Sequence, residues 1–177
     1  IGISPVDAIN NGVAGATYPI PRLGIPATLL SDGPAGVRMG KLATVFMSPT
    51  GIASTWNVKA MEEIGARTAA EAKHYAVDVM LAPALNIQRS PMGGRDFEYY
   101  SEDPVVSGEV ASAYVRALQD AGVGVSVKHY AANNQETSRM GGDVIVSERA
   151  LREIYLSGFE RTIQEDPWTF MGSYNKV

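Results

Sequence analysis

The sequence predicts an α/β protein that forms part of a (β/α)8 TIM-like barrel. Two observations support this prediction: short apolar segments alternate with helical segments along the chain, and unusual polar residues gather where the apolar segments end. This order of elements implies parallel strands joined by right-handed crossovers. A complete barrel needs about 250 residues. We therefore expect residues 1–177 to form a single, partial (β/α)-barrel domain.

The expected strands are short and mostly apolar. Residues 25–30 form a β-prone run that ends at the turn "SDGP". Residues 77–83 have the composition of a buried strand, and residues 122–129 form the next strand after a helix stop at Gly122. Residues 168–175 are expected to form the last strand.

Helices are predicted between these strands. Residues 58–75 have a helical composition, and apolar residues recur at helical spacing across residues 105–121. A third helix is expected to begin near Ser147, which is a suitable N-cap. Its apolar stripe consists of Leu151, Ile154, Tyr155, Phe159 and Ile163. The segment "IQRSPMGGRDFEYYSEDP" (87–104) is predicted to be an irregular loop, because its prolines and its Gly-Gly pair would break a helix.

Composition excludes several classes of function. The formal net charge is −4 and there is no basic cluster, which argues against nucleic acid and against an anionic membrane surface as partners. The chain has no cysteine and two histidines far apart, so we expect no disulfide, no metal site and no cofactor. No apolar run has the length of a membrane span, and no signal peptide is visible at the start. The chain does not begin with Met, so localisation stays open, with the cytoplasm slightly favoured.

The polar residues at the expected strand ends have the chemistry of a sugar-binding site. A sugar is an array of hydroxyls that donate and accept hydrogen bonds, so its site needs fixed acceptors, fixed donors and an apolar or aromatic floor. The strand ends supply Asp32, Arg38, Arg95, Lys128, His129, Arg139 and Tyr174. The glycine-rich segments lack the spacing of a phosphate-binding loop, and no nucleophile elbow is present.

Each of these residues also has a simpler interpretation. Asp32 could form an Asx turn in "SDGP", and Arg95 and Glu98 could form a structural ion pair that holds the loop. Lys128 follows an apolar strand, so it must leave the core or find a partner there. A further alternative is an aldolase that uses Lys128 to form a Schiff base.

Taken together, the motifs resemble those of glycoside hydrolase family 3, most closely its bacterial β-glucosidases. The resemblance covers the chain from about residue 15 to residue 177. It rests on the ordered motifs "SDGPAGVR", "LAPALNIQRSPMGGRDFEYYSEDP", "KHYAANNQETSR", "SERALREIYLSGFE" and "MGSYNKV". It implies a retaining, exo-acting hydrolase that removes terminal β-D-glucosyl residues from β-glucosides or oligosaccharides. This chain differs from the usual pattern at Tyr130, where the family commonly has Phe, and at "MSPTG" (47–51).

The resemblance also implies roles for individual residues in the first sugar subsite. Asp32, Arg38 and Arg95 would bind hydroxyls on the non-reducing side of the ring. Lys128 and His129 would bind the middle hydroxyls, and the peptide bond between them is often cis in the family.

On the other side of the ring, Arg139 and Tyr174 would approach the 2-hydroxyl and the nucleophile, and Met171 would line the floor. No catalytic residue is assigned to this chain. The family's nucleophilic Asp follows "SYNKV" on the next strand and its acid/base Glu lies in a later domain, so the remainder of the enzyme or a second chain would complete the barrel. A pair drawn from Asp32, Asp96 and Glu136 is not favoured by spacing. The alternatives are a β-xylosidase or related exo-β-glycosidase, and a non-catalytic sugar-binding fragment that needs another chain.

Overall fold

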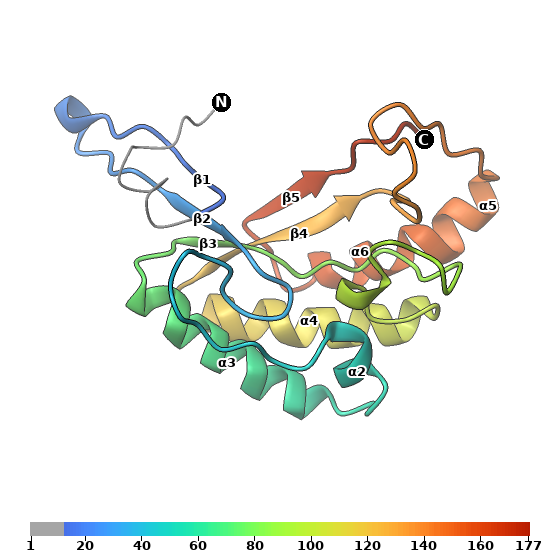
Figure 1. Ribbon diagram of the computed structural model, residues 1–177, viewed down its shortest axis with the longest axis horizontal. Helices are drawn as coiled ribbons and strands as arrows, with labels where there is room; N and C mark the ends of the chain where they lie inside the picture. Colours follow the sequence, from blue (N-terminus) through green and yellow to red (C-terminus); the bar gives the residue numbers. More distant parts are fainter. Residues whose placement is uncertain (1–12) are drawn as a thin grey trace.

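A five-stranded sheet with the order β1-β2-β3-β4-β5 forms the centre of the computed structural model, which describes residues 13–177 (Figure 1). The strands β2 to β5 are parallel, and β1 pairs with β2 in the antiparallel direction. Their bounds are Gly15–Ala16 (β1), Leu29–Asp32 (β2), Val79–Leu81 (β3), Gly124–Tyr130 (β4) and Thr169–Gly172 (β5). The parallel strands and intervening helices confirm the predicted α/β class.

Among the predicted strands, the first one, β2, differs most from its predicted range. β2 begins at Leu29 and not at residue 25, because residues 17–28 form an antiparallel arm. Thr17 and Thr28 are hydrogen bonded across this arm, and its tip holds the short 3-10 helix η1 (Pro21–Leu23). β1 is therefore an antiparallel strand that the alternating pattern did not predict.

The two long helices lie where the sequence predicts them. α3 spans Val58–His74 and α4 spans Pro104–Asp120, and they pack against each other on one face of the sheet (Figure 1). Each begins at a side-chain cap: Asn57 accepts a hydrogen bond from a backbone N–H of α3, and Asp103 accepts two from α4. A Cβ at Gly65 would lie 2.8 Å from the Cβ of Ala117, so glycine permits the close approach of the two helices.

The third predicted helix begins at its expected cap but is not continuous. Ser147 accepts a hydrogen bond from the N–H of Ala150, as predicted. The segment then divides into α5 (Glu148–Ala150), a π-helical turn η3 (Leu151–Tyr155) and α6 (Ser157–Ile163). The wider π turn changes the helical register, so the predicted stripe splits. Phe159 is buried, whereas Ile163 is 57% exposed.

The segment before α3 holds a short helix that the pattern did not predict. α2 spans Pro49–Ala53, with Ser48 as its cap and Pro49 at its first position. The 87–104 segment is irregular, as predicted, apart from the single 3-10 turn η2 (Asp96–Glu98).

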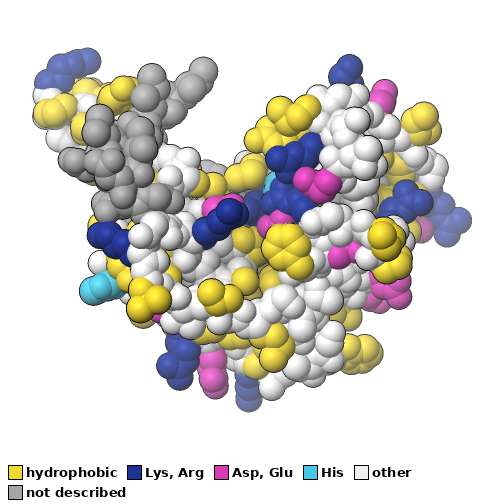
Figure 2. Space-filling view, in the orientation of Figure 1, with side chains coloured by type: hydrophobic (Ala, Val, Ile, Leu, Met, Phe, Trp, Pro, Cys, Tyr) yellow, Lys and Arg dark blue, Asp and Glu magenta, His cyan; other side chains and the backbone are white. Residues whose placement is uncertain are grey.

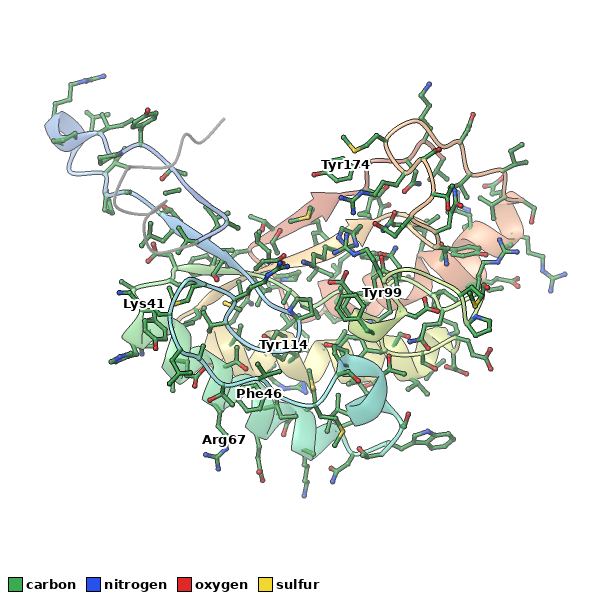
Figure 3. All side chains as sticks on the ribbon, viewed as in Figure 1. Lys41, Phe46, Arg67, Tyr99, Tyr114 and Tyr174 are labelled. Carbon is green, nitrogen blue, oxygen red and sulfur yellow. The ribbon has the colours of Figure 1, made fainter. Side chains whose placement is uncertain are left out.

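The core lies between the sheet and the helices α3, α4 and α6. Tyr114 of α4, labelled in Figure 3, is fully buried there, and Phe159 of α6 closes one end. In residues 13–177, every helix is too short or too polar to span a membrane. The packed helices hold the strands parallel, so the residues after β2, β3, β4 and β5 meet at one edge of the sheet.

Candidate functional site

A cavity of about 920 Å³ lies at the carboxyl ends of the parallel strands. All of the site residues predicted from the sequence line it: Asp32, Arg38, Arg95, Lys128, His129, Arg139, Met171 and Tyr174. Figure 2 shows this region as a hollow in which basic, acidic and histidine side chains lie together. The fold therefore brings together residues from separate parts of the chain.

The turn after β2 places Arg38 beside Asp32. The N–H of Arg38 donates to the carbonyl of Asp32 at 2.8 Å, and its guanidinium lies 3.8 Å from the Asp32 carboxylate. This tight turn requires two glycines. A Cβ at Gly33 would lie 1.6 Å from the Gly36 carbonyl oxygen, and one at Gly36 would lie 2.3 Å from that of Thr44. Both glycines have positive φ, at 146° and 123°. The "SDGPAG" segment thus serves the turn as well as the site.

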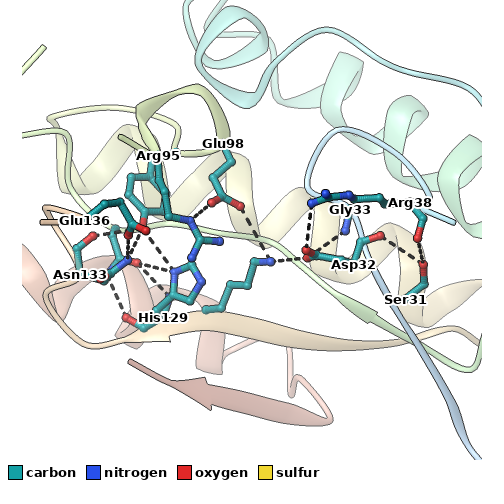
Figure 4. A network of polar contacts seen from close by, with 12 residues as sticks. Ser31, Asp32, Gly33, Arg38, Arg95, Glu98, His129, Asn133 and Glu136 are labelled. Atoms are coloured by element: carbon teal, nitrogen blue, oxygen red, sulfur yellow. Dashed lines mark hydrogen bonds and ion pairs between the residues drawn. The ribbon is translucent and has the colours of Figure 1, made fainter. Parts of the chain in front are cut away.

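Lys128 connects the end of β4 to two carboxylates. Its Nζ lies 2.6 Å from Asp32 and 3.8 Å from Glu98, and its side chain is only 2% exposed (Figure 4). Lys128 is therefore a buried cation with partners, which was one of the two outcomes expected for a lysine after an apolar strand. A Schiff-base aldolase needs a lysine Nζ that is free to attack a carbonyl, whereas this Nζ faces two carboxylates.

Arg95 is held by Glu98 in the loop 87–104. The Arg95 Nε donates to the Glu98 carboxylate, and the two side chains are 18% and 5% exposed. This confirms the predicted ion pair, and the same Glu98 also faces Lys128. One buried carboxylate thus holds two cations of the cavity in place.

Two neutral residues anchor the turn around Arg95, one in α2 and one in the loop itself, and sequence reasoning missed both. The hydroxyl of Thr50, in α2, donates to the carbonyls of Asp96 and Tyr99 at 2.6 and 2.8 Å. The Gln88 amide donates to the same two carbonyls. The short helix α2 therefore anchors the turn that presents Arg95.

His129 is enclosed by Asn86 and Tyr99. Its Nδ1 lies 3.1 Å from the Asn86 Oδ1 and 3.3 Å from the Tyr99 hydroxyl. Burial, and after it the cations Arg95, Lys128 and Arg139, lowers the pKa of His129 to about 3. The peptide bond between Lys128 and His129 is cis, as the family resemblance implied.

The far side of the cavity is formed by Arg139 and Tyr174. The Arg139 guanidinium is 2.7 Å from Glu136 and lies over the Tyr174 ring, 5.2 Å from its centroid. Asn133 donates to Glu136 at 3.1 Å and to the Tyr99 hydroxyl at 2.9 Å. Glu136 and Asn133 are thus further members of the network that were not assigned a role from the sequence.

The acids near the cavity are committed to ion pairs. Asp32 faces Lys128 and Arg38, and Glu136 faces Arg139. Asp96, the third acid considered as a catalytic partner, lines a separate and smaller cavity with Ser48 and Arg89. No group of three metal-binding side chains occurs in the part of the chain that the structure describes. The site therefore presents fixed acceptors and fixed donors around a space that could hold a sugar ring.

Comparison with known proteins agrees with this chemistry. The family model described as the glycosyl hydrolase family 3 N-terminal domain matches residues 10–177. The thermostable β-glucosidase B of Acetivibrio thermocellus is 43% identical over an alignment of 174 residues that covers 91% of this chain and 23% of that protein. An exo-α-(1→6)-L-arabinopyranosidase of Bifidobacterium longum is 43% identical over an alignment of 168 residues that covers 87% of this chain and 22% of that protein.

Solved structures give the same result for the fold. The structure of β-glucosidase 3B from Thermotoga neapolitana in complex with glucose has a TM-score of 0.91 and 53% identity over 93% of this chain and 24% of that chain. A β-glucosidase from Streptomyces venezuelae in complex with D-glucose has a TM-score of 0.93 and 36% identity over 99% of this chain and 22% of that chain. The chain thus spans less than a quarter of the length of these relatives.

Proposed function

Because the chain belongs to glycosyl hydrolase family 3, we propose that it is the sugar-binding part of a β-glucosidase. The whole protein would hydrolyse terminal, non-reducing β-D-glucosyl residues. Residues of this chain would form the subsite that holds the glucosyl ring. The relatives whose names identify them as β-glucosidases support the proposal, as do those whose structures contain glucose.

One structural observation carries the proposal: a continuous row of alternating charges across the cavity. Asp32, Lys128, Glu98 and Arg95 are joined in that order by ion pairs. Each polar group is held by its neighbours before a ligand arrives, so binding a sugar would immobilise few side chains. Fixed donors beside fixed acceptors suit the adjacent hydroxyls of a pyranose ring.

The individual roles follow the expected arrangement. We assign Asp32, Arg38 and Arg95 to hydroxyls on the non-reducing side, and Lys128 and His129 to the middle of the ring. The remaining cavity residues are assigned to the side of the 2-hydroxyl and the ring floor; these are Arg139, Met171 and Tyr174.

We further propose a retaining mechanism with both catalytic acids outside residues 1–177. Retaining hydrolysis needs two carboxyl groups about 5–5.5 Å apart, one as nucleophile and one as acid/base. Asp32, Glu98 and Glu136 are each paired with a cation, which suits them to binding and not to proton transfer. The nucleophile would reach the sugar beside Arg139 and Tyr174.

The test uses the full-length protein that contains this chain. It should hydrolyse 4-nitrophenyl β-D-glucopyranoside, and proton NMR of the first product should show β-glucose. Asp32→Asn should lower kcat/KM by about tenfold or more. The asparagine amide is a weaker hydrogen-bond acceptor than the carboxylate and cannot neutralise the positive charge of Lys128. Absence of hydrolysis with glucose binding intact would favour the alternative of a non-catalytic sugar-binding protein. An α-glucose product would exclude the retaining mechanism.

A second substrate class is favoured by the relatives named as arabinopyranosidases. Arabinopyranosides and xylosides lack the hydroxymethyl group of glucose. Comparing them with a glucoside therefore tests whether the space beside Arg38 is occupied by a hydroxymethyl group. We expect the β-glucoside to have the highest kcat/KM of the 4-nitrophenyl β-D-glucoside, β-D-xyloside and α-L-arabinopyranoside. A higher value for either of the other two would reassign the substrate within the same family.

A further inference from the structure

Asn86 makes three contacts with a single residue, His129. Its Oδ1 accepts the backbone N–H of His129 at 2.9 Å, and its Nδ2 donates to the His129 carbonyl at 2.8 Å. The same Oδ1 lies 3.1 Å from the imidazole Nδ1. Asn86 and His129 are 2% and 5% exposed, so water does not compete for these contacts. His129 is therefore held in place by an uncharged neighbour, Asn86, and not only by the charged residues of the cavity.

The backbone contacts fix the orientation of the Asn86 amide. A backbone N–H can only donate and a backbone carbonyl can only accept. Turning the amide over would face Nδ2 toward the N–H and Oδ1 toward the carbonyl, and both contacts would become repulsive. The oxygen of Asn86 must consequently be the atom that faces the imidazole.

The orientation of Asn86 in turn fixes the histidine tautomer. Because Oδ1 can only accept, the Nδ1 beside it must carry the hydrogen. The Tyr99 hydroxyl leads to the same result: it donates its own hydrogen to the Asn133 carbonyl at 3.0 Å, so it too can only accept from Nδ1. Two neighbours on different segments thus require hydrogen on the same nitrogen.

The charges around the ring agree with a neutral imidazole. Arg95, Lys128 and Arg139 face it and disfavour a further positive charge. The acids nearby, Glu98 and Glu136, are already paired with those cations. With hydrogen on Nδ1 and no second proton, the Nε2 carries a free lone pair.

We propose that Asn86 is a positioning residue that holds His129 as the neutral Nδ1–H tautomer, so that its Nε2 accepts a hydrogen bond from a sugar hydroxyl. His129 lines the cavity, and its Nδ1 side faces Asn86 and Tyr99, so Nε2 is the nitrogen left for a ligand. Lys128 and Arg95 can only donate, so a hydroxyl in the middle of the ring would receive from a cation and give its own hydrogen to His129. The identity of the ligand rests on the proposed function, whereas the tautomer does not.

The tautomer can be measured without any activity. In the full-length protein labelled with 15N-histidine, the two ring nitrogens of His129 give separate shifts that identify which is protonated, and His129→Gln assigns them by loss of signal. We expect a protonated Nδ1 and an unprotonated Nε2 at pH 7. In Asn86→Ala only the longer contact of 3.3 Å to the Tyr99 hydroxyl is left to hold hydrogen on Nδ1, so the shifts should move part of the way toward a mixture of both tautomers. An Nε2–H tautomer in the wild type, or an unchanged tautomer in Asn86→Ala, would overturn the proposal.

Asn134→Ala is the matched control. Asn134 also donates through its amide to a backbone carbonyl, that of Ile87, but within residues 13–177 it is not hydrogen bonded to His129. Its removal should leave the His129 shifts unchanged. A change equal to that of Asn86→Ala would mean that the shifts report general loosening of this region, and the positioning role would be lost.

Binding of modified sugars tests the acceptor role. Fluorine accepts weakly and cannot donate, so calorimetry is done with glucose and with its deoxy and deoxyfluoro forms at positions 2, 3 and 4. At the position that faces His129, both changes should weaken binding by about tenfold. A fluoro sugar that binds as well as glucose at every position would exclude Nε2 as an acceptor. If glucose itself does not bind, the proposed function fails while the tautomer measurement still decides the role of Asn86.

Discussion

The Nζ of Lys128 lies 2.6 Å from Oδ1 of Asp32, although the two residues are 96 positions apart in the sequence. Asp32 ends β2 and Lys128 lies in the last part of β4, with β3 between these two strands. The contact therefore depends on the correct assembly of three parallel strands. It connects the stability of the sheet to the chemistry of the cavity, and the following predictions use this connection.

Lys128→Met should destabilise the protein strongly. Methionine fills a similar volume, but Asp32 and Glu98 then face each other without the buried cation between them. We expect the free energy of unfolding to fall by about 2–3 kcal/mol, less than the roughly 3–5 kcal/mol for a fully buried broken pair, because the Asp32 side chain is a third exposed. Urea denaturation of the full-length protein measures it. Lys59→Met, at an exposed position of α3, is the control, and an equal loss in both variants would refute the prediction.

Glu98→Gln should weaken sugar binding more than it changes the fold. The glutamine keeps the shape of Glu98 but removes the charge that holds Arg95 and Lys128. Loss of charge-assisted hydrogen bonds should raise KM for the aryl β-glucoside by about tenfold. Steady-state kinetics measures this effect. The control Glu102→Gln, at an exposed position of the same loop, should have the KM of the wild type. If Glu98→Gln also has the wild-type KM, the Glu98 carboxylate is not needed to hold Arg95 and Lys128 for sugar binding.

Local signals predicted the long helices well. α3 and α4 begin and end within about one residue of their predicted bounds, because their caps and apolar periodicity are contained in the segments themselves. Likewise, Asp32, Lys128 and His129 could be proposed as site residues because polar side chains that follow apolar strands are unusual.

The neutral supports could not be predicted in the same way. Thr50 and Gln88 act through loop carbonyls, and no sequence pattern shows which carbonyls a loop turns toward them. Asn86 did leave a signal, since a polar amide within the apolar run "LAPALNI" must find a buried partner. The break at η3 has no comparable signal, because its residues keep the spacing of an ordinary helix.

Thr50→Val tests whether α2 supports the binding loop. Valine keeps the size of threonine but removes the hydrogen bonds to the carbonyls of Asp96 and Tyr99. We expect a loss of about 1–2 kcal/mol in the free energy of unfolding, and a higher KM because Arg95 is less firmly placed. Thermal denaturation and kinetics on the full-length protein measure both. The control Thr137→Val, at an exposed position, should change neither the free energy of unfolding nor KM. A Thr50→Val variant with wild-type stability and KM would show that α2 does not support the binding loop.

His129→Gln should reduce the sensitivity of the fold to acid. His129 has a pKa of about 3 in the folded protein against an ordinary value of 6.5, so below pH 6.5 the unfolded chain takes up a proton that the folded chain refuses. The stability from this residue is complete above pH 6.5 and falls as the pH drops toward 3. Between pH 7 and pH 5 the wild type should lose about 2 kcal/mol that His129→Gln does not lose, as measured by urea denaturation at each pH. His74→Gln, at an exposed position of α3, should keep the wild-type slope, and parallel slopes for all three proteins would show that His129 is free to take up the proton in the folded state.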